Sequence, residues 1–284
     1  MPSKKTIKRR IKSVGTTKHI MKAMNMVAAS KLQKGKAKLN ISRPLYREAL
    51  RMVNTLRVCE DAMEHVFFKR RPVKNALYVV ISSDRGLCGG YNTNVSQVAY
   101  EQMSKSDADE HIIAFGSKGR DFFRRRRKNI IHTYPSVSEV HFFENSEIIC
   151  DVLLKKFLSG EVDEVYIAFT NFETALSYEP KIMRVLPLGD EELKPEFKGD
   201  SMLYEPNPEH FIEHAVTAYL TTFIYDAMLE SNSSEQASRM IAMDSATKNA
   251  SDIIDDLTLM YNRIRQSHIT QEITEIVSGA NVTK

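Results

Sequence analysis

The segment of this 284-residue chain most suggestive of chemistry is a glycine-rich decamer, residues 83–92 (SDRGLCGGYN). It follows an apolar run typical of a buried strand, and such a turn before a helix can hold phosphate on backbone N–H groups. The decamer has neither the spacing and terminal Lys-Ser/Thr of a P-loop nor the Gly-x-Gly-x-x-Gly pattern. The alternative, which the sequence favours, is a tight turn whose glycines allow close packing, with Asp84 and Arg85 as polar contacts.

Two histidines form the second motif. His210, Glu213 and His214 match the His-x-x-Glu-His arrangement of some zinc peptidases. A catalytic zinc also needs a third ligand and a cleft, and a histidine pair at the start of a long helix is typical of a solvated face. Asp84 and Glu101 are possible general acids, but no paired acid in a predicted pocket supports them. The sequence therefore predicts no catalytic residues, no metal site and no cofactor.

Basic residues gather in two clusters. One lies within residues 4–12, and the other is the run of five cations at 124–128. Either can hold nucleic-acid phosphates, but no aromatic side chain precedes Tyr46 to stack on a base. A transit peptide is excluded because the helical pattern continues past residue 40. The simpler interpretation is that these cationic flanks of a coiled coil bind acidic protein surfaces.

The charge is divided along the chain. Residues 1–58 carry 16 Lys and Arg and a single acid, Glu48, whereas residues 209–284 carry five bases and 11 acids. The two end segments are therefore expected to attract each other or an oppositely charged partner. The chain is 42% hydrophobic, with no run long enough to span a bilayer and no secretory signal. Its three cysteines are odd in number and widely spaced, so reduced thiols are expected.

Both ends of the chain predict long helices. Residues 209–278 contain neither Gly nor Pro, which predicts one helix after Pro208 that reaches on the order of 100 Å and protrudes. Its predicted coiled-coil seam is Met243, Ala246, Ala250, Ile253, Leu257, Met260 and Ile264. Beyond Ile264 the phase shifts to Ile269, Ile273 and Ile276.

The amino-terminal segment repeats this pattern. Eleven of the fifteen positions 7, 11, 14, 18, 21, 25, 28, 32, 35, 39, 42, 46, 49, 53 and 56 are apolar. Pro44 is expected to bend or break this helix. Because the two ends carry opposite charge, we expect them to pair as an antiparallel coiled coil.

The middle of the chain predicts an α/β fold. Short β-branched or aromatic runs at 76–82, 111–115, 164–170 and 181–186 indicate strands, and stretches near 93–104, 117–127 and 145–158 indicate helices. Alternation of this kind is typical of a parallel sheet. The predicted fold is therefore α/β plus long helices: an antiparallel coiled coil from residues 1–58 and 208–284, with a Rossmann-like α/β domain at 75–190 inserted between them.

Five stretches carry a resemblance to a known family. They are residues 20–32 (IMKAMNMVAASKL), 83–92, 203–208 (LYEPNP), 235–246 (EQASRMIAMDSA) and 261–280 (YNRIRQSHITQEITEIVSGA). With these stretches the sequence resembles, nearly end to end, the gamma subunit of the rotary (F-type) ATP synthase. The resemblance implies a non-catalytic central-stalk rotor that mechanically couples ion flow through the membrane ring to ATP synthesis or hydrolysis, with the catalytic sites on partner beta subunits.

The resemblance also implies partners and contact residues. The partners are the alpha and beta subunits of a hexamer, the epsilon subunit and the membrane c-ring, with one copy per complex, no homo-oligomer and no nucleic acid. The implied location is peripheral, on the cytoplasmic face of the bacterial cell membrane. Contacts with the hexamer would fall on Lys22, Met24, Glu235, Arg239, Gln266, Thr270 and Glu272, and contacts near the ring on Tyr204 and Glu205.

Two other functions remain open from the residues alone. One is an α/β nucleotide-binding protein with a coiled-coil extension, and the other a nucleic-acid-binding coiled coil. The chain also departs from the family. The cysteine-bearing regulatory insertion of the chloroplast form is absent, so thiol control is not expected, and the run at 124–128 is more basic than the resemblance implies.

Overall fold

The computed structural model describes residues 3–56, 63–135, 139–188 and 208–282. The chain divides into two compact units: unit 1 comprises Met1–Ala28 and Arg239–Lys284, and unit 2 comprises Ala29–Ser238. Two long helices, α1 (Lys4–Leu56) and α6 (Pro208–Val282), each contribute to both units. The prediction of long terminal helices is confirmed, and α6 begins at Pro208, as expected of a first-turn proline.

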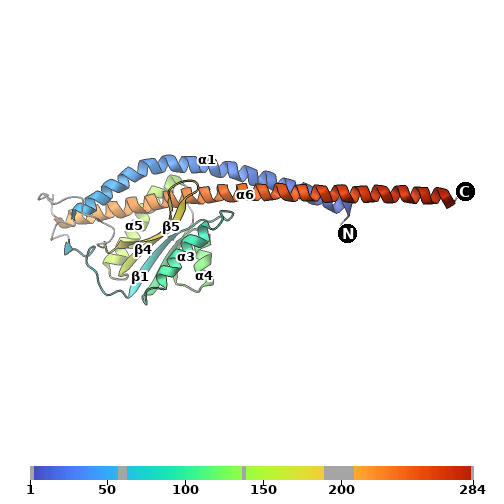
Figure 1. Cartoon of the computed structure of the whole chain (residues 1–284). Helices are drawn as coiled ribbons and strands as arrows, with labels where there is room; N and C mark the ends of the chain where they lie inside the picture. Colours follow the sequence, from blue (N-terminus) through green and yellow to red (C-terminus); the bar gives the residue numbers. More distant parts are fainter. Residues whose placement is uncertain (1–2, 57–62, 136–138, 189–207, 283–284) are drawn as a thin grey trace. The chain divides into compact units, whose positions relative to one another are not determined.

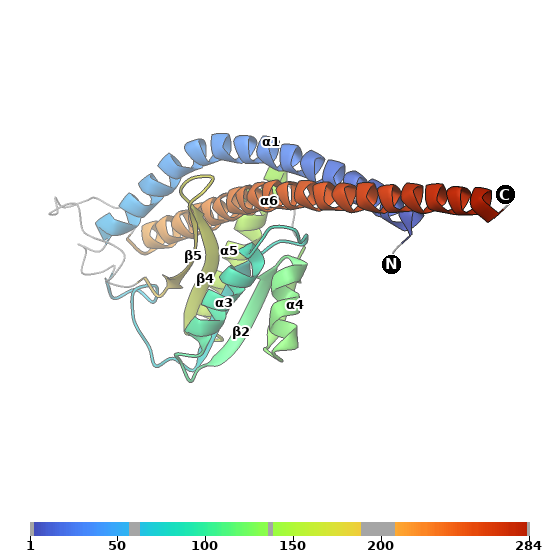
Figure 2. The same ribbon diagram turned by 45° about the vertical axis from the view of Figure 1, so that its right-hand side comes forward.

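Pro44 lies inside α1 and does not interrupt it, so of the two expected outcomes, a bend or a break, the break does not occur. The helix curves along the part that belongs to unit 2, which agrees with the predicted bend (Figure 1, Figure 2). Pro44 is exposed, so its ring displaces no packed neighbour, and water can reach the carbonyl that loses its donor. A helix accommodates proline by bending under these conditions.

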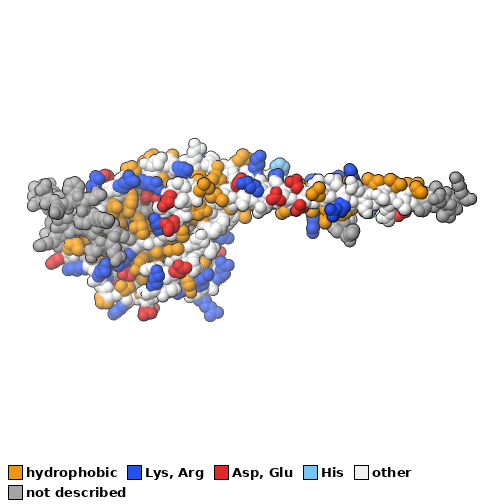
Figure 3. All heavy atoms as spheres, viewed as in Figure 1, with side chains coloured by type: hydrophobic (Ala, Val, Ile, Leu, Met, Phe, Trp, Pro, Cys, Tyr) orange, Lys and Arg blue, Asp and Glu red, His pale blue; other side chains and the backbone are white. Residues whose placement is uncertain are grey.

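Unit 1 is an antiparallel pair of helices. The Asn25 side-chain amide donates to the carbonyl oxygen of Met240 at 2.8 Å, and the Lys4 ammonium lies 5.9 Å from the centre of the Tyr261 ring. The contact partner on α6 thus moves toward the C-terminus as the residue on α1 moves toward the N-terminus. Beyond Tyr261, α6 extends past the end of α1, with hydrophobic side chains along it (Figure 3).

The predicted seam is confirmed on α1 and partly wrong on α6. All fifteen α1 positions are buried or half-buried. On α6, Ile253 and Met260 are 49% and 47% exposed, whereas their neighbours Ile254 and Tyr261 are half-buried. In a heptad the buried positions are separated alternately by three and four residues, and the series can begin with either step. Ile253 and Ile254 are both apolar, as are Met260 and Tyr261, so the sequence alone did not show which member of each pair is buried.

Unit 2 contains a five-stranded sheet in the order β3-β2-β1-β4-β5. The strands are β1 (Asn75–Ile81), β2 (Asp109–Phe115), β3 (Ile130–Tyr134), β4 (Glu164–Phe172) and β5 (Tyr178–Leu186). Neighbouring strands are parallel except for the antiparallel pair β4–β5.

The sheet therefore contradicts one prediction and adds a strand. A wholly parallel sheet fails at β5, because the short connection at 173–177 forms a hairpin, whereas a parallel return needs a dozen or more residues. Strand β3 was not predicted. It is a short edge strand whose residues are exposed or only half-buried, so it lacks the continuous apolar run of the central strands.

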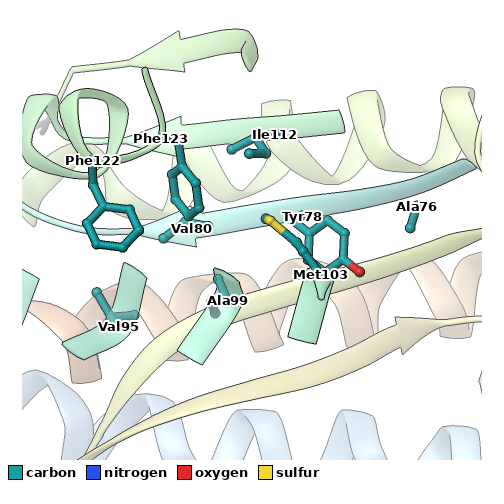
Figure 4. Close-up of a cluster of buried hydrophobic side chains, with 10 residues drawn as sticks. Ala76, Tyr78, Val80, Val95, Ala99, Met103, Ile112, Phe122 and Phe123 are labelled. Atoms are coloured by element: carbon teal, nitrogen blue, oxygen red, sulfur yellow. The ribbon is translucent and has the colours of Figure 1, made fainter. Parts of the chain in front are cut away.

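Helices cover both faces of the sheet. Helices α3 (Tyr91–Met103) and α4 (Ser117–Arg125) lie on one face, and α5 (Phe142–Leu158), which follows the short η1 helix (Glu139–His141), lies on the other (Figure 2). The core beneath α3 and α4 contains Tyr78, Val95, Ile112, Phe122 and Phe123 (Figure 4). The predicted helices and central strands are confirmed to within a few residues.

Candidate interaction surfaces

In a doubly wound sheet a ligand usually binds at the carboxyl ends of the strands, between the two strands where the strand order reverses. Here that point lies between β1 and β4. Part of α6 contacts it directly. The Ser231 hydroxyl accepts a hydrogen bond from the Thr170 backbone N–H at 3.2 Å, and the Ser234 hydroxyl donates to the Thr170 carbonyl at 3.3 Å. A helix of the chain itself therefore lies where such folds hold a ligand.

The glycine-rich decamer also contacts α6. The Ser238 hydroxyl donates to the Cys88 carbonyl at 2.6 Å, and Gly89 has a left-handed backbone with φ of +54°. A Cβ at Gly89 would lie 3.2 Å from the Ser238 hydroxyl oxygen. Asp84 accepts a hydrogen bond from the Ser117 backbone N–H at 2.6 Å. The decamer is the tight packing turn that the sequence favoured.

Little space remains beside this contact. The cavity there has a volume of about 30 Å³ and is lined by Ile81, Ser82, Tyr91, Phe115, Phe142, Met228, Ser231, Asn232 and Glu235. Small-molecule sites usually measure roughly 300–1,000 Å³. The crevice therefore has no room for a nucleotide.

The residues expected to contact partners fall in different environments. Gln266, Thr270 and Glu272 are exposed, on the part of α6 that α1 does not cover. Lys22 is exposed, and Met24 is half-buried.

The other expected contacts are less accessible or lie elsewhere. Arg239 is only 8% exposed. Glu235 belongs to unit 2, where it is half-buried and lines the 30 Å³ cavity. Tyr204 and Glu205 lie outside the described residues.

Sequence reasoning missed a buried polar cluster in unit 2. The Ser42 hydroxyl donates to Asp226 Oδ1 at 2.5 Å, and Arg43 Nη2 donates to Glu230 Oε1 at 2.9 Å and to the Phe172 carbonyl at 2.6 Å. Burial raises the pKa of Glu230 to about 7, although the bond from Arg43 opposes the shift. The four-residue spacing of Asp226 and Glu230 on a largely apolar stretch of α6 was the available signal.

The histidine motif does not form a metal site in the part of the chain that the structure describes. The His210 and His214 ring centres lie 5.6 Å apart, and no group of three or more His, Cys, Asp or Glu side chains there is placed to hold an ion. Among the described residues, Cys88 and Cys150 are buried and not joined in a disulfide, and burial raises the pKa of Cys150 to about 11. None of the described helices combines the length and apolarity needed to cross a bilayer.

These features define a class of protein in which an α/β sheet is inserted between two long helices. One of these helices fills the crevice of the sheet where related folds bind a ligand. A family model described as ATP synthase matches residues 3–282. The ATP synthase gamma chain of Alkaliphilus metalliredigens is 39% identical over 283 residues, which cover 98% of each chain. The sodium ion specific gamma chain of Acetobacterium woodii is 38% identical, with 96% of each chain covered.

A solved structure agrees with these relatives. A chain in the central stalk and c-ring structure of the Tetrahymena thermophila mitochondrial ATP synthase has a TM-score of 0.61 and 26% identity, and the match covers 80% of this chain and 99% of that chain. The chain belongs to the ATP synthase gamma chain family.

Proposed function

We propose that the chain is the central-stalk rotor subunit of an F-type ATP synthase, where it mechanically couples ion flow through the membrane ring to ATP synthesis or hydrolysis. The observation that carries this proposal is similarity to gamma chains over the whole length, 39% identity across 98% of both chains. The subunit is non-catalytic, and the catalytic sites lie on partner beta subunits. One copy binds the alpha and beta hexamer, the epsilon subunit and the c-ring, peripherally, on the cytoplasmic face of the bacterial membrane.

We also propose the division of labour along the chain. Residues 1–58 and 208–284 form the shaft, and residues 75–190 form the inserted α/β domain. Rotation of the shaft presents a different face to each catalytic subunit in turn. A partner shifts a conformational equilibrium only through contacts that differ between the states, so an asymmetric helix surface biases each subunit toward a different nucleotide affinity.

The exposed end of α6 supports this mechanism. Ile269, Ile273 and Ile276 are 45%, 56% and 71% exposed, and apolar side chains slide past a partner without forming directional bonds. Gln266, Thr270 and Glu272 lie on the same part of the helix, where exposed polar groups can form position-dependent contacts. Arg239 is nearly buried, so a partner reaches it less easily than it reaches Gln266.

A coupling measurement tests these contacts. In the assembled complex, reconstituted in vesicles, Gln266→Ala is expected to lower the ions pumped per ATP hydrolysed, and Arg239→Ala to do so less. Lys248→Ala is the control, because its side chain is 74% exposed and outside the proposed contacts. Unchanged coupling in both the Gln266 and the Arg239 variants would contradict the proposed contacts.

Co-purification tests the function itself. An affinity tag on this chain is expected to recover alpha, beta and epsilon subunits and the c-ring in fixed stoichiometry, with one copy of the tagged chain. Recovery of the tagged chain alone, or of two copies per complex, would refute the proposal.

A further inference from the structure

The cationic run at residues 124–128 lies at the end of α4 and in the connection to β3. Figure 3 shows Lys and Arg side chains on this part of unit 2. Two of the five cations cap the helix: Arg125 Nε donates to the Asp121 carbonyl and Arg126 Nη1 to the Phe122 carbonyl, each at 3.2 Å. Such contacts are expected of arginines at a helix C-terminus.

Two further cations form ion pairs. Arg124 lies 3.3 Å from an Asp121 carboxylate oxygen. Lys128 Nζ donates to both carboxylate oxygens of Glu110, at 2.5 and 2.8 Å. Structural roles therefore account for four of the five cations, and Arg127 remains.

Arg127 occupies a backbone position that favours glycine. Its φ is 56°. Its N–H donates to the Arg124 carbonyl at 3.1 Å, and the Lys128 N–H donates to the Phe123 carbonyl at 3.2 Å. This pair of bonds is the Schellman motif, in which the left-handed residue is usually Gly because a side chain disfavours that conformation. In the described part of the chain the Arg127 guanidinium has no hydrogen-bond or ion-pair partner, so no side-chain contact there adds to these two backbone bonds.

The Arg127 side chain lines an open pocket of about 480 Å³, a volume typical of small-molecule sites. The other lining residues are Asn75, Asp109, Glu110, His111, Arg126, Lys128 and Asn129. Asn129 Nδ2 lies 3.1 Å from His111 Nδ1, and His111 Nε2 lies 3.4 Å from Asn75 Oδ1. These contacts link three polar side chains along the amino-terminal edge of the sheet.

The charges of the pocket favour an anion. Lys128 pairs with Glu110, which leaves Arg126 and Arg127 against the single carboxylate of Asp109, an exposed residue. A guanidinium presents several N–H donors in a planar fork that matches two oxygens of a phosphate group. The side-chain amides of Asn75 and Asn129 keep N–H groups that their contacts with His111 do not use, and these can supply further donors to a group that has three or more oxygens.

We propose that this pocket binds a small, soluble phosphate-bearing anion, with the Arg127 guanidinium as its main ligand. A phosphate group can also come from a lipid headgroup. The soluble source is preferred because a rotor can carry a diffusible ligand through each turn, whereas a contact with a stationary surface would oppose rotation. That choice of source rests on the proposed function, but the existence of the site does not.

The test measures inorganic pyrophosphate binding to the full-length chain by isothermal titration calorimetry at low salt. Arg127→Gly is the informative variant, because glycine suits the left-handed backbone and should keep or raise the thermal midpoint of unfolding. It is expected to weaken binding about tenfold, the effect of losing one charge-assisted hydrogen-bonding group.

Two variants serve as controls. Arg125→Gln removes the same charge from an exposed neighbour that does not line the pocket, and binding should change less than about twofold. Asp109→Asn removes the opposing carboxylate, and binding should tighten. A parallel sedimentation assay with phosphatidate vesicles examines the lipid source.

Three results would overturn the proposal: no pyrophosphate binding by the wild-type chain, equal weakening by the Arg127 and Arg125 variants, or binding to vesicles alone. Equal weakening would mean that general charge, and not the pocket, attracts the anion. The assay contains no partner subunit, so its failure is distinguishable from failure of the co-purification test.

Discussion

At the scale of single residues, the carboxyl group of Glu230 is unusual because it is buried. Burial raises its pKa to about 7 and also raises the pKa of Asp226. The charged groups around the two carboxyls come from α1: Arg43 contacts Glu230, and Arg43 and Arg47 both act on Asp226. The pair tends to take up protons on folding, because burial penalises the charged carboxylates more than these arginines stabilise them.

This proton uptake predicts a pH dependence of stability. In the unfolded chain Glu230 titrates near 4.5, so between this value and about 7 the folded chain binds more protons than the unfolded chain. The free energy of unfolding therefore falls as pH rises through this window. We expect Glu230→Gln to remove a decrease on the order of 2 kcal/mol, measured as urea midpoints from about pH 5 to 8.

The matched control for this measurement is Glu48→Gln, because Glu48 is an exposed residue of α1. Its pH profile should follow that of the wild type. If the Glu230 and Glu48 variants both retained the wild-type slope, the buried carboxyl would not be the source of the pH dependence.

At the scale of elements, two glycines of α1 test how closely the long helices approach. A Cβ at Gly35 would lie 2.6 Å from the hydroxyl oxygen of Ser233 on α6, whereas a Cβ at Gly15 would meet nothing within 4 Å. Gly35→Ala is therefore expected to be less stable than Gly15→Ala by about 1–3 kcal/mol, because the Ser233 hydroxyl must rotate or the helices must move apart, and this cost opposes the gain in helix propensity. Gly15→Ala should stabilise the chain by up to about 1 kcal/mol through helix propensity.

Denaturant unfolding of both variants gives these two free energies. Adding Ser233→Gly to Gly35→Ala removes the clashing hydroxyl and should restore part of the loss. Equal effects of the two Gly→Ala changes would show that the helices do not meet closely at Gly35.

The corrected seam of α6 gives a second prediction about elements. Ile254 is half-buried and its neighbour Ile253 is 49% exposed. We expect Ile254→Ala to lower the free energy of unfolding by about 1–2 kcal/mol and Ile253→Ala by less than about 0.5 kcal/mol. Thermal unfolding monitored by circular dichroism compares the two, and the reverse order would restore the seam first predicted.

At the scale of the whole molecule, the uncovered end of α6 determines how the chain behaves without partners. Replacing Ile269, Ile273 and Ile276 together by Ser should leave the thermal midpoint within about 2 °C of the wild type, because these side chains are already exposed in the chain. The same change should reduce self-association in light scattering and weaken binding to the proposed partner, the alpha and beta hexamer. A large fall in the midpoint would mean that the chain itself buries this stripe.

Much of the fold was predictable because its signals are local. The absence of Gly and Pro from residues 209–278 predicted α6, and the apolar repeat of α1 predicted its buried positions. The central strands β1, β2 and β4 were evident as apolar runs. Strand β3 was missed because an edge strand needs no such run, and the direction of β5 depended on a short hairpin connection.

The candidate surfaces were predictable to a smaller extent. The resemblance placed Gln266 and Arg239 together as contact residues, but the structure leaves Gln266 exposed and Arg239 nearly buried. The cationic run at 124–128 was evident in the sequence. The end of α4 and the edge of the sheet decide how its members differ: the Arg127 guanidinium has no hydrogen-bond or ion-pair partner among the described residues, whereas the side chains of its neighbours contact the chain.

The sequence by itself determined the kinds of elements, their order and the charge of the two ends, because periodicity and composition act along the chain. The tertiary structure alone decided which of Ile253 and Ile254 enters the seam, and that the serines of α6 fill the crevice of the sheet. These features depend on which distant segments meet. Packing fixes the side of a helix that faces its neighbour and the space that remains for a ligand, and neither is encoded in any single stretch of residues.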